Sequence, residues 1–336
     1  MLGNLYANKC GKGDNESTIE RLSESKRTYL KDAELDKQLN QEGFVVVPFL
    51  SGSEVEELKQ VYFGSHSEEQ VAFYATAHHQ DSDFRKKMSV AISAVLEPHA
   101  ATVFVDCDLL GASFIVKAPK AKSSLQPHQD WNIVDETEFR SFNVWIPLVD
   151  LTEENGAIQV LPKSHNWLRG YRHSSIECAY REVHDLVWES MKPLYMKAGE
   201  ALIYDHALLH ASKANKSDEK RIAVASGVMP SNAQMYFYWN NNGTIEQYES
   251  NTDFFMTENI FAGPAGLAKV ADLDYDFPTV EEERFYRFIG KEPPVKESTQ
   301  VQVVRTKPEE QDLRLWKVYT PMNILREINY RITGRG

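Results

Sequence analysis

Hydrophobic positions in the first third of the chain recur at helical spacing on either side of one continuous apolar run. Residues 35–50 predict a short helix that ends at Gly43, followed by a buried strand. In the next segment Ser53 and Glu56 stand three residues apart ahead of apolar positions at helical spacing, which predicts a helix that begins with a capping box. A second amphipathic helix is predicted to end near Pro98.

Between about residues 109 and 249 the pattern changes to short apolar runs separated by turns. The runs are rich in branched and aromatic residues, which favours strands. They read LLGASFIVKAP, SFNVWIPLVDL, GAIQVLP, EALIYD, RIAVASGVMP and AQMYFYW. Asn155-Gly156 and Asn242-Gly243 suit turns with positive φ. Many short strands without alternating helices predict a mainly β fold with flanking helices, of the sandwich or jelly-roll type.

The boundaries of these patterns predict one core domain with extensions. We expect a mobile N-terminal arm over residues 1–30, because its polar composition buries little apolar surface. The domain would span residues 31–290, with its β core at about 109–249. Residues 291–336 predict a linker and a basic, aromatic extension, which is either a helix docked on the surface or a peripheral contact with a membrane or partner.

Charge and composition narrow the function classes. A net charge of −12 over 336 residues argues against nucleic acid as the main partner and favours an acidic enzyme. The three cysteines are scattered, so they predict neither a disulfide framework nor a cysteine metal site. The sequence has no signal-peptide pattern at its start and no apolar stretch long enough to cross a membrane. We therefore expect a cytoplasmic protein with no transmembrane segment.

The segment HQDW contains the first candidate for chemistry. Two residues apart on extended backbone, His128 and Asp130 point to the same side and can hold one metal ion. A His-x-Asp pair alone is weak evidence, because both residue types also stabilise turns. A third ligand from a distant strand would strengthen it, and His206 and His210 both follow the run EALIYD.

Two imidazoles and one carboxylate on one face of a metal are typical of non-haem Fe(II) oxygenases. Zinc hydrolases use similar ligands, but commonly with an HExxH helix or a cysteine set that this chain lacks. Arg221, eleven residues after His210, would lie near the metal on the neighbouring strand. Its guanidinium could hold the far carboxylate of a dicarboxylate co-substrate.

These segments together resemble the phytanoyl-CoA dioxygenase family of Fe(II)- and 2-oxoglutarate-dependent oxygenases. The resemblance covers roughly residues 36–249 and runs from HQDW through NVWIPLVDLTEENGAIQVLPKSH to GEALIYDHALLHASKANKSDEKRIAV. It implies a double-stranded β-helix (a cupin-like jelly roll) and Fe(II), 2-oxoglutarate and O2 as cofactor and co-substrates. The residues that match the family's metal ligands are His128, Asp130 and His210, and those that match its 2-oxoglutarate contacts are Arg221, Ser212 and Trp145.

Two details of the resemblance concern residues next to this set. The segment KAP, from Lys117, is similar to the family's Lys-Pro-Pro, and Lys163 in LPKSH replaces a glycine, which alters a turn but not the ligands. His210 is favoured over His206 because only His210 has the serine and arginine at the family's offsets. His165 reads as a structural hydrogen-bonding residue, and the pair His78-His79 as surface residues.

The implied reaction is hydroxylation of an unactivated C–H bond of a small organic molecule, with release of succinate and CO2. Asp130 argues against halogenation and for this outcome or its relatives below, because halogenases of related folds have Gly or Ala in its place. Desaturation or cyclisation from the same hydrogen abstraction is the alternative within the class, and a non-catalytic cupin-like binding module is the alternative outside it. Fold and family do not fix the substrate.

The predicted substrate pocket lies between residues 165 and 197 and in the segment MYFYWNNNG. Trp145 itself could either line the pocket or pack in the core, on the strand face that also carries Asn143 and Pro147. The polar residues of the predicted pocket hint at an anionic or polar substrate, although a solvated lid with ordinary salt bridges explains them equally well. They are Arg169, Tyr171, Arg172, His173, Arg181 and Tyr236.

Overall fold

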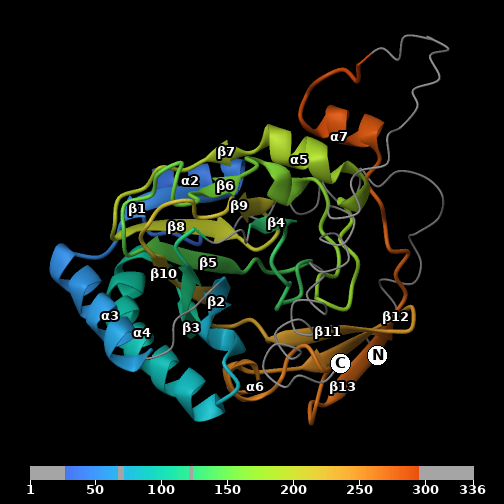
Figure 1. Cartoon of the computed structure of the whole chain (residues 1–336). Coiled ribbons are helices and arrows are strands. Elements are labelled where there is room, and N and C mark those ends of the chain that lie inside the picture. Colours follow the sequence, from blue (N-terminus) through green and yellow to red (C-terminus); the bar gives the residue numbers. More distant parts are fainter. Residues whose placement is uncertain (1–26, 67–71, 121–123, 295–336) are drawn as a thin grey trace, which may run out of the picture.

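Two antiparallel sheets lie against each other at the centre of the protein (Figure 1). The computed structural model describes residues 27–66, 72–120 and 124–294. The larger sheet has the order β1-β8-β5-β10-β3-β2 and the smaller β4-β9-β6-β7. The strands of the larger sheet are β1 (Phe44–Pro48), β2 (Phe73–Ala75), β3 (Cys107–Lys117), β5 (Phe142–Pro147), β8 (Glu200–Asp205) and β10 (Arg221–Pro230). Those of the smaller sheet are β4 (Leu125–His128), β6 (Ile158–Val160), β7 (Lys192–Pro193) and β9 (His210–Ser212).

The chain alternates between the two sheets as it passes from β3 to β10. Strands β3, β5, β8 and β10 belong to the larger sheet, and the strands between them belong to the smaller one. This alternation agrees with the expected double-stranded β-helix. The prediction of a mainly β fold with flanking helices is confirmed.

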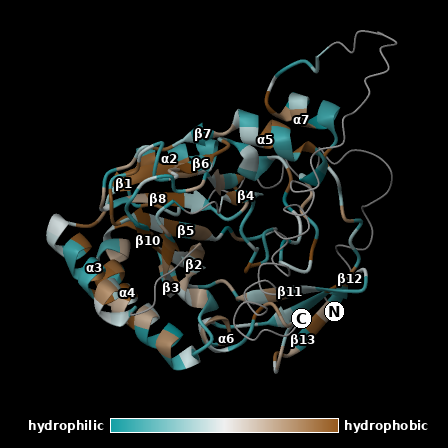
Figure 2. Ribbon diagram, in the orientation of Figure 1, coloured by the Kyte–Doolittle hydropathy of each residue, from teal (hydrophilic) through white to brown (hydrophobic). Residues whose placement is uncertain are grey.

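Helices cover the outer face of the larger sheet. They are α2 (Ala33–Glu42), α3 (Gly52–Ser65) and α4 (Ser82–Val103), and α4 packs on β3 (Figure 1). The largest hydrophobic cluster lies between these helices and the sheet and includes Leu58, Ile92 and Phe114, none of which is exposed. Figure 2 shows the same division, with hydrophobic residues concentrated in the central strands and hydrophilic ones on the outer helix faces.

Two predicted helix ends are wrong in detail. The capping box of α3 is formed by Ser51 and Glu54, not by Ser53 and Glu56, because Ser51 has the extended backbone of a cap and Ser53 lies inside the helix. Helix α4 continues through Pro98 to Val103. Packing of its inner face, including the buried Leu96 and Ala100, outweighs the hydrogen bond that the proline removes.

A third sheet, β11-β12-β13, extends the molecule beside the central strands (Figure 1). Its strands are β11 (Tyr236–Asn241), β12 (Thr244–Glu249) and β13 (Lys269–Leu273), and three short helices complete the described chain: α5 (His184–Ser190), α6 (Thr252–Thr257) and α7 (Glu282–Phe288). The predicted turn Asn242-Gly243 joins β11 to β12, and both residues have positive φ.

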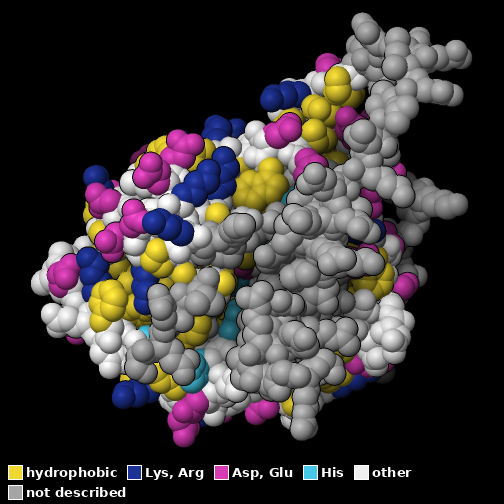
Figure 3. Space-filling model, in the orientation of Figure 1, with side chains coloured by type: hydrophobic (Ala, Val, Ile, Leu, Met, Phe, Trp, Pro, Cys, Tyr) yellow, Lys and Arg dark blue, Asp and Glu magenta, His cyan; other side chains and the backbone are white. Residues whose placement is uncertain are grey.

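The surface in Figure 3 intersperses acidic and basic side chains around the helices and the outer strands. At the N-terminal side, Tyr29 and Leu30 are buried, so packed structure begins within the last residues of the predicted arm. The rest of that arm, up to residue 26, and the predicted extension from residue 295 onward lie outside the described residues. In the part of the chain that the structure describes, no helix has the length and apolar composition needed to span a membrane.

Candidate active site

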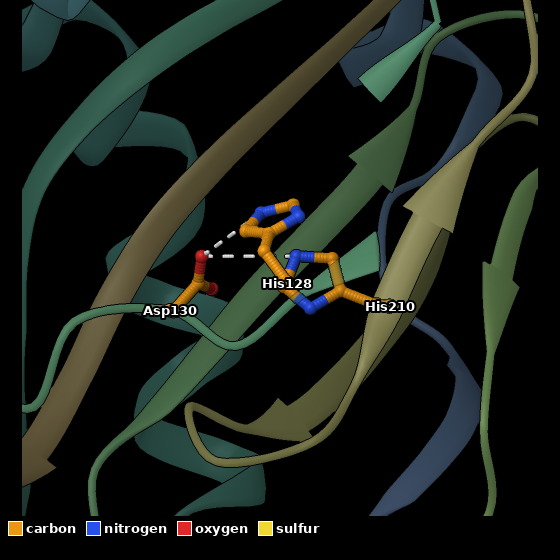
Figure 4. Close-up of side chains that lie close together, drawn as sticks. All are labelled: His128, Asp130 and His210. Carbon is orange, nitrogen blue, oxygen red and sulfur yellow. Dashed lines mark ion pairs between the residues drawn. The ribbon is translucent and has the colours of Figure 1, made fainter. Parts of the chain in front are cut away.

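Three potential metal ligands converge on the inner side of the smaller sheet. His128 is the last residue of β4 and His210 the first of β9, and the two strands pair with these residues directly opposite each other. Asp130 follows two residues after His128, where β4 has ended. One ligand atom of each residue lies within 4.8 Å of the others (Figure 4). The sequence therefore placed all three correctly in one cluster.

Backbone carbonyls orient both imidazoles. Nδ1 of His128 lies 2.7 Å from the carbonyl oxygen of Gln126, and Nδ1 of His210 lies 3.0 Å from that of Leu208. Because a carbonyl only accepts, each Nδ1 carries the proton and each Nε2 presents its lone pair. Both Nε2 atoms lie 3.7 Å from Oδ1 of Asp130 (Figure 4). The three donor atoms thus face one shared point.

The protonation states of the cluster suit metal binding at neutral pH. Burial, and then the proximity of His210, lowers the pKa of His128 to about 4. Burial alone would raise the pKa of Asp130, but the surrounding imidazoles, His210 first, lower it to about 2. A neutral imidazole and an ionised carboxylate need lose no proton when a cation binds.

Arg221 is a buried cation beside this cluster. It is 2% exposed, and burial lowers the pKa of its guanidinium to about 10. One nitrogen donates to the carbonyl of Gly156 at 3.2 Å, and the guanidinium carbon lies 5.3 Å from the centre of the Trp145 ring. Nε of Arg221 has no hydrogen-bond partner among the described residues, and no carboxylate in that part of the chain pairs with it. A buried charge of this kind is costly until an anion pairs with it.

Lys117 adds a second buried basic side chain at the same place. It is the direct partner of Arg221 across the β3–β10 pair, and it is not exposed at all. Its ammonium donates to the carbonyl oxygens of Ser212, at 2.9 Å, and of Lys213. Burial first, and the charge of Arg221 second, lower the pKa of Lys117 to about 6. The site therefore combines the guanidinium of Arg221, the amino group of Lys117, Trp145 and the backbone of Ser212.

The strand that carries Arg221 differs from the prediction. The sequence placed Arg221 on the neighbour of the strand that carries His210, but β10 follows β9 only along the chain. In space β10 lies in the larger sheet between β5 and β3, because the chain crosses to the opposite sheet after β9. This position puts Arg221 next to Trp145 of β5. The prediction that Trp145 and Asn143 share one strand face is confirmed by their contacts with Arg221 and Asp130.

The other histidines lie outside the cluster. His206 is 5% exposed and its Nδ1 lies 2.9 Å from the hydroxyl of Ser141. His165, read as structural, is fully buried with Nε2 3.1 Å from the carbonyl oxygen of Asn40. Of the pair expected at the surface, His78 is exposed and His79 half-buried.

The arginines of the predicted pocket are already paired with carboxylates. Arg172 binds Glu136 through two nitrogens, at 2.6 and 2.8 Å, and Arg169 lies 2.5 Å from Asp205. The side chains of both arginines are at most 10% exposed, so they do not form a solvated lid either. The hint of an anionic substrate is weakened, because both arginines are already neutralised within the protein. The sequence did not reveal this pairing, since Asp205 and Glu136 lie far from these arginines along the chain.

The remaining predicted pocket residues lie in two places. His173 packs against Trp131, the residue after Asp130, with ring centres 4.1 Å apart, and Tyr171 packs on Tyr238. Arg181 donates to the hydroxyl of Thr279 near the surface. The ring of His173 and the backbone N–H of Tyr236, which donates to the carbonyl of Ile133 at 2.8 Å, thus reach the segment that follows Asp130.

Tyr204 is a site residue that the sequence did not reveal. Its hydroxyl lies 2.9 Å from Oδ2 of Asp130 and 3.4 Å from Nε2 of His210. A tyrosine in a strand usually signals core packing, and only the pairing of β8 with β5 brings its hydroxyl to the ligands. Alternation along EALIYD was the one available signal, because it places Leu202 and Tyr204 on the same face.

The family model for phytanoyl-CoA dioxygenase (PhyH) matches residues 39–223, which is more than half of the chain and includes every ligand of the cluster. The chain belongs to the phytanoyl-CoA dioxygenase family. Family membership and the His-Asp-His group agree with dependence on Fe(II), 2-oxoglutarate and O2.

Curated relatives match over shorter stretches. The dioxygenase trt7 of Aspergillus terreus is 25% identical over 128 residues, which are 36% of this chain and 41% of that protein. The phytanoyl-CoA dioxygenase domain-containing protein 1 of Danio rerio is 27% identical over 131 residues, 37% of this chain and 45% of that protein. The matched part thus spans less than half the length of these relatives.

Two solved structures from nogalamycin biosynthesis are similar at low identity. The carbocyclase SnoK is 22% identical with a TM-score of 0.45, covering 61% of this chain and 86% of that one. The epimerase SnoN, in complex with Fe3+, alpha ketoglutarate and nogalamycin RO, is 19% identical with a TM-score of 0.46, covering 78% and 97%. The family assignment rests on the match to the PhyH model.

The departure of this chain from the family's glycine at position 163 is visible in the backbone. Lys163 has φ 71°, a left-handed conformation that glycine adopts without strain. Its side chain lies 3.5 Å from Glu42 at the surface, away from the ligands. Lys163 thus adopts the turn conformation that suits glycine, and its side chain does not touch the ligands.

Proposed function

We propose that this protein is an Fe(II)- and 2-oxoglutarate-dependent oxygenase that hydroxylates an unactivated C–H bond of a small organic molecule. The observation that carries the proposal is the combination of the His128, Asp130 and His210 cluster with a buried guanidinium that no described carboxylate neutralises. The overall reaction converts substrate, 2-oxoglutarate and O2 into hydroxylated product, succinate and CO2.

The residues present fit the absent metal and co-substrate. Two neutral imidazoles and one carboxylate are a suitable donor set for Fe(II), which would supply the activation of O2. The orphaned Nε of Arg221 fits an anionic group of 2-oxoglutarate, and the amino group of Lys117 lies beside Arg221 on the paired strand. Trp145 and Ser212, both at most 5% exposed, would exclude water from that group.

Each residue then has a separate task. The ligands fix the metal at the end of β4 and β9, and Arg221 orients the co-substrate by its far carboxylate. The larger sheet closes the site from behind, because Trp145 and Tyr204 come from its central strands. Desaturation and cyclisation begin from the same hydrogen abstraction, so identification of the product is needed to distinguish them from hydroxylation.

The test is succinate formation by purified protein with Fe(II), ascorbate and 2-oxoglutarate, followed by mass analysis of candidate substrates. Hydroxylation adds one oxygen to the product, whereas desaturation and ring closure each remove two hydrogens. His210→Ala is expected to abolish succinate formation, and His99→Ala, at a surface histidine paired with Glu54, is expected to retain it. Bound iron without succinate from a broad substrate panel would favour a non-catalytic binding module.

A further inference from the structure

The two oxygens of the Asp130 carboxylate have different surroundings. Oδ1 lies 3.7 Å from Nε2 of His128 and 3.7 Å from Nε2 of His210, so it faces the point that the ligands share (Figure 4). Oδ2 accepts a hydrogen bond from the hydroxyl of Tyr204 at 2.9 Å and a longer one, at 3.4 Å, from the amide of Asn143. The carboxylate is therefore held with one oxygen toward the ligands and the other toward two donors.

These donors belong to a rigid frame. Asn143 on β5 and Tyr204 on β8 are direct partners in the larger sheet, so their side chains stand next to each other on one face. Tyr204 is 3% exposed and packs in the hydrophobic cluster that includes Trp145 and Leu202. The sheet thus presents two donors at fixed positions.

Asp130 needs such support because it lies beyond the end of β4, in a segment without regular structure. Its backbone has a separate anchor, since Nε of Arg172 donates to the carbonyl oxygen of Asp130 at 2.8 Å. Arg172 is in turn held by Glu136 through two hydrogen bonds. Loss of a donor to Oδ2 should therefore free the carboxylate to rotate without displacing the main chain.

We propose that Tyr204 and Asn143 are positioning residues that restrict Asp130 to binding the metal through Oδ1 alone. The inference rests on the proposed function. Three ligands that each used one atom would leave positions on the metal open for 2-oxoglutarate and O2. A carboxylate that bound through both oxygens would occupy one of these positions. Groups that hold metal ligands in place commonly matter for metal affinity almost as much as the ligands.

The test compares Tyr204→Phe and Asn143→Leu, which remove the donors but keep similar volumes, with the wild-type protein. Tyr180→Phe is the matched control, because Tyr180 is also a buried tyrosine, 2% exposed. Its hydroxyl has no hydrogen-bond partner among the described residues, and its ring packs in a different hydrophobic cluster. Metal affinity is measured anaerobically with Fe(II) and with Co(II), whose d–d absorption reports the coordination number.

Tyr204→Phe is expected to bind metal about 10- to 100-fold more weakly and to show a changed Co(II) spectrum. Asn143→Leu should show a smaller change in the same direction, because its hydrogen bond is longer, and Tyr180→Phe should match the wild type. Unchanged affinity and spectrum in Tyr204→Phe would overturn the inference and leave the proposed function intact. Weaker binding with an unchanged spectrum would also overturn it, since the carboxylate would then bind as before. A wild-type protein that binds neither metal would refute the proposed function itself.

Discussion

Replacement of Arg221 by alanine should weaken 2-oxoglutarate binding strongly and leave iron binding nearly unchanged. The guanidinium is 2% exposed, donates to the backbone carbonyl of Gly156 and lies over the Trp145 ring. Its charge is therefore available to a carboxylate in a site shielded from water. Removing one partner of such a desolvated pair costs about 2 to 5 kcal/mol, because the other charge is left buried and unpaired.

This free energy corresponds to an affinity loss of about 30-fold to about 4,000-fold. Arg221→Lys should lose less than Arg221→Ala, because it keeps the charge but not the planar fork that binds two oxygens. The assay is a titration of 2-oxoglutarate into anaerobic Fe(II) protein, followed by the metal-to-ligand charge-transfer absorption. A separate Fe(II) titration without 2-oxoglutarate gives the metal affinity.

Arg181→Ala is the matched control, because Arg181 is partly exposed and donates to Thr279 away from the cluster. It should bind 2-oxoglutarate as the wild type does. Equal affinities for 2-oxoglutarate in Arg221→Ala and the wild type would refute the assignment of this buried cation to the co-substrate. The cluster would then remain a His-Asp-His metal site of unknown reaction.

Three further predictions concern the metal, a buried charge and a turn. His210→Ala should abolish stoichiometric Fe(II) binding in equilibrium dialysis while the circular dichroism spectrum persists, whereas His99→Ala should bind one ion as the wild type does. In the folded protein Lys117 has a pKa near 6, below its unfolded value, so the cost of burying it is largest below pH 6 and falls as the pH rises toward 10. The free energy of unfolding of Lys117→Met, measured in urea, should therefore exceed that of the wild type by more at pH 6 than at pH 9. An equal difference at both pH values would contradict this. Lys163→Gly should raise the free energy of unfolding by about 1 kcal/mol, because the left-handed backbone strains lysine more than glycine. A melting temperature below that of the wild type would show that the lost contact with Glu42 outweighs this relief of strain.

The sequence was sufficient for residues whose geometry is local or whose spacing is set by the family. His128 and Asp130 lie two residues apart and bring Nε2 and Oδ1 within 3.7 Å of each other, and Gly43 ends α2 in the left-handed conformation that a helix end requires. His210 and Arg221 were identified by their spacing within the family's motif, not by local geometry. The choice between two serines for the cap of α3 failed, because both lie at capping-box distance from a glutamate.

Features that depend on strand pairing could not be read from the sequence. The contact of Tyr204 with Asp130 requires the register that sets Tyr204 opposite Asn143, and that register is fixed by packing between distant strands. The position of Arg221 in the larger sheet likewise follows from the crossing of the chain after β9. No periodicity within a single segment contains this information.

The charges around the site differ between its two sides. Arg169 and Arg172 are neutralised by Asp205 and Glu136 within the protein, so this side of the site is already paired before any ligand binds. Arg221 has no such carboxylate among the described residues, and with a pKa that burial lowers only to about 10 it stays charged at neutral pH. A protein tolerates buried cations without a partner where a ligand completes the pair. We therefore expect a dianionic co-substrate to be selected by charge, and the substrate to be selected mainly by shape and by contacts with aromatic side chains such as Trp131.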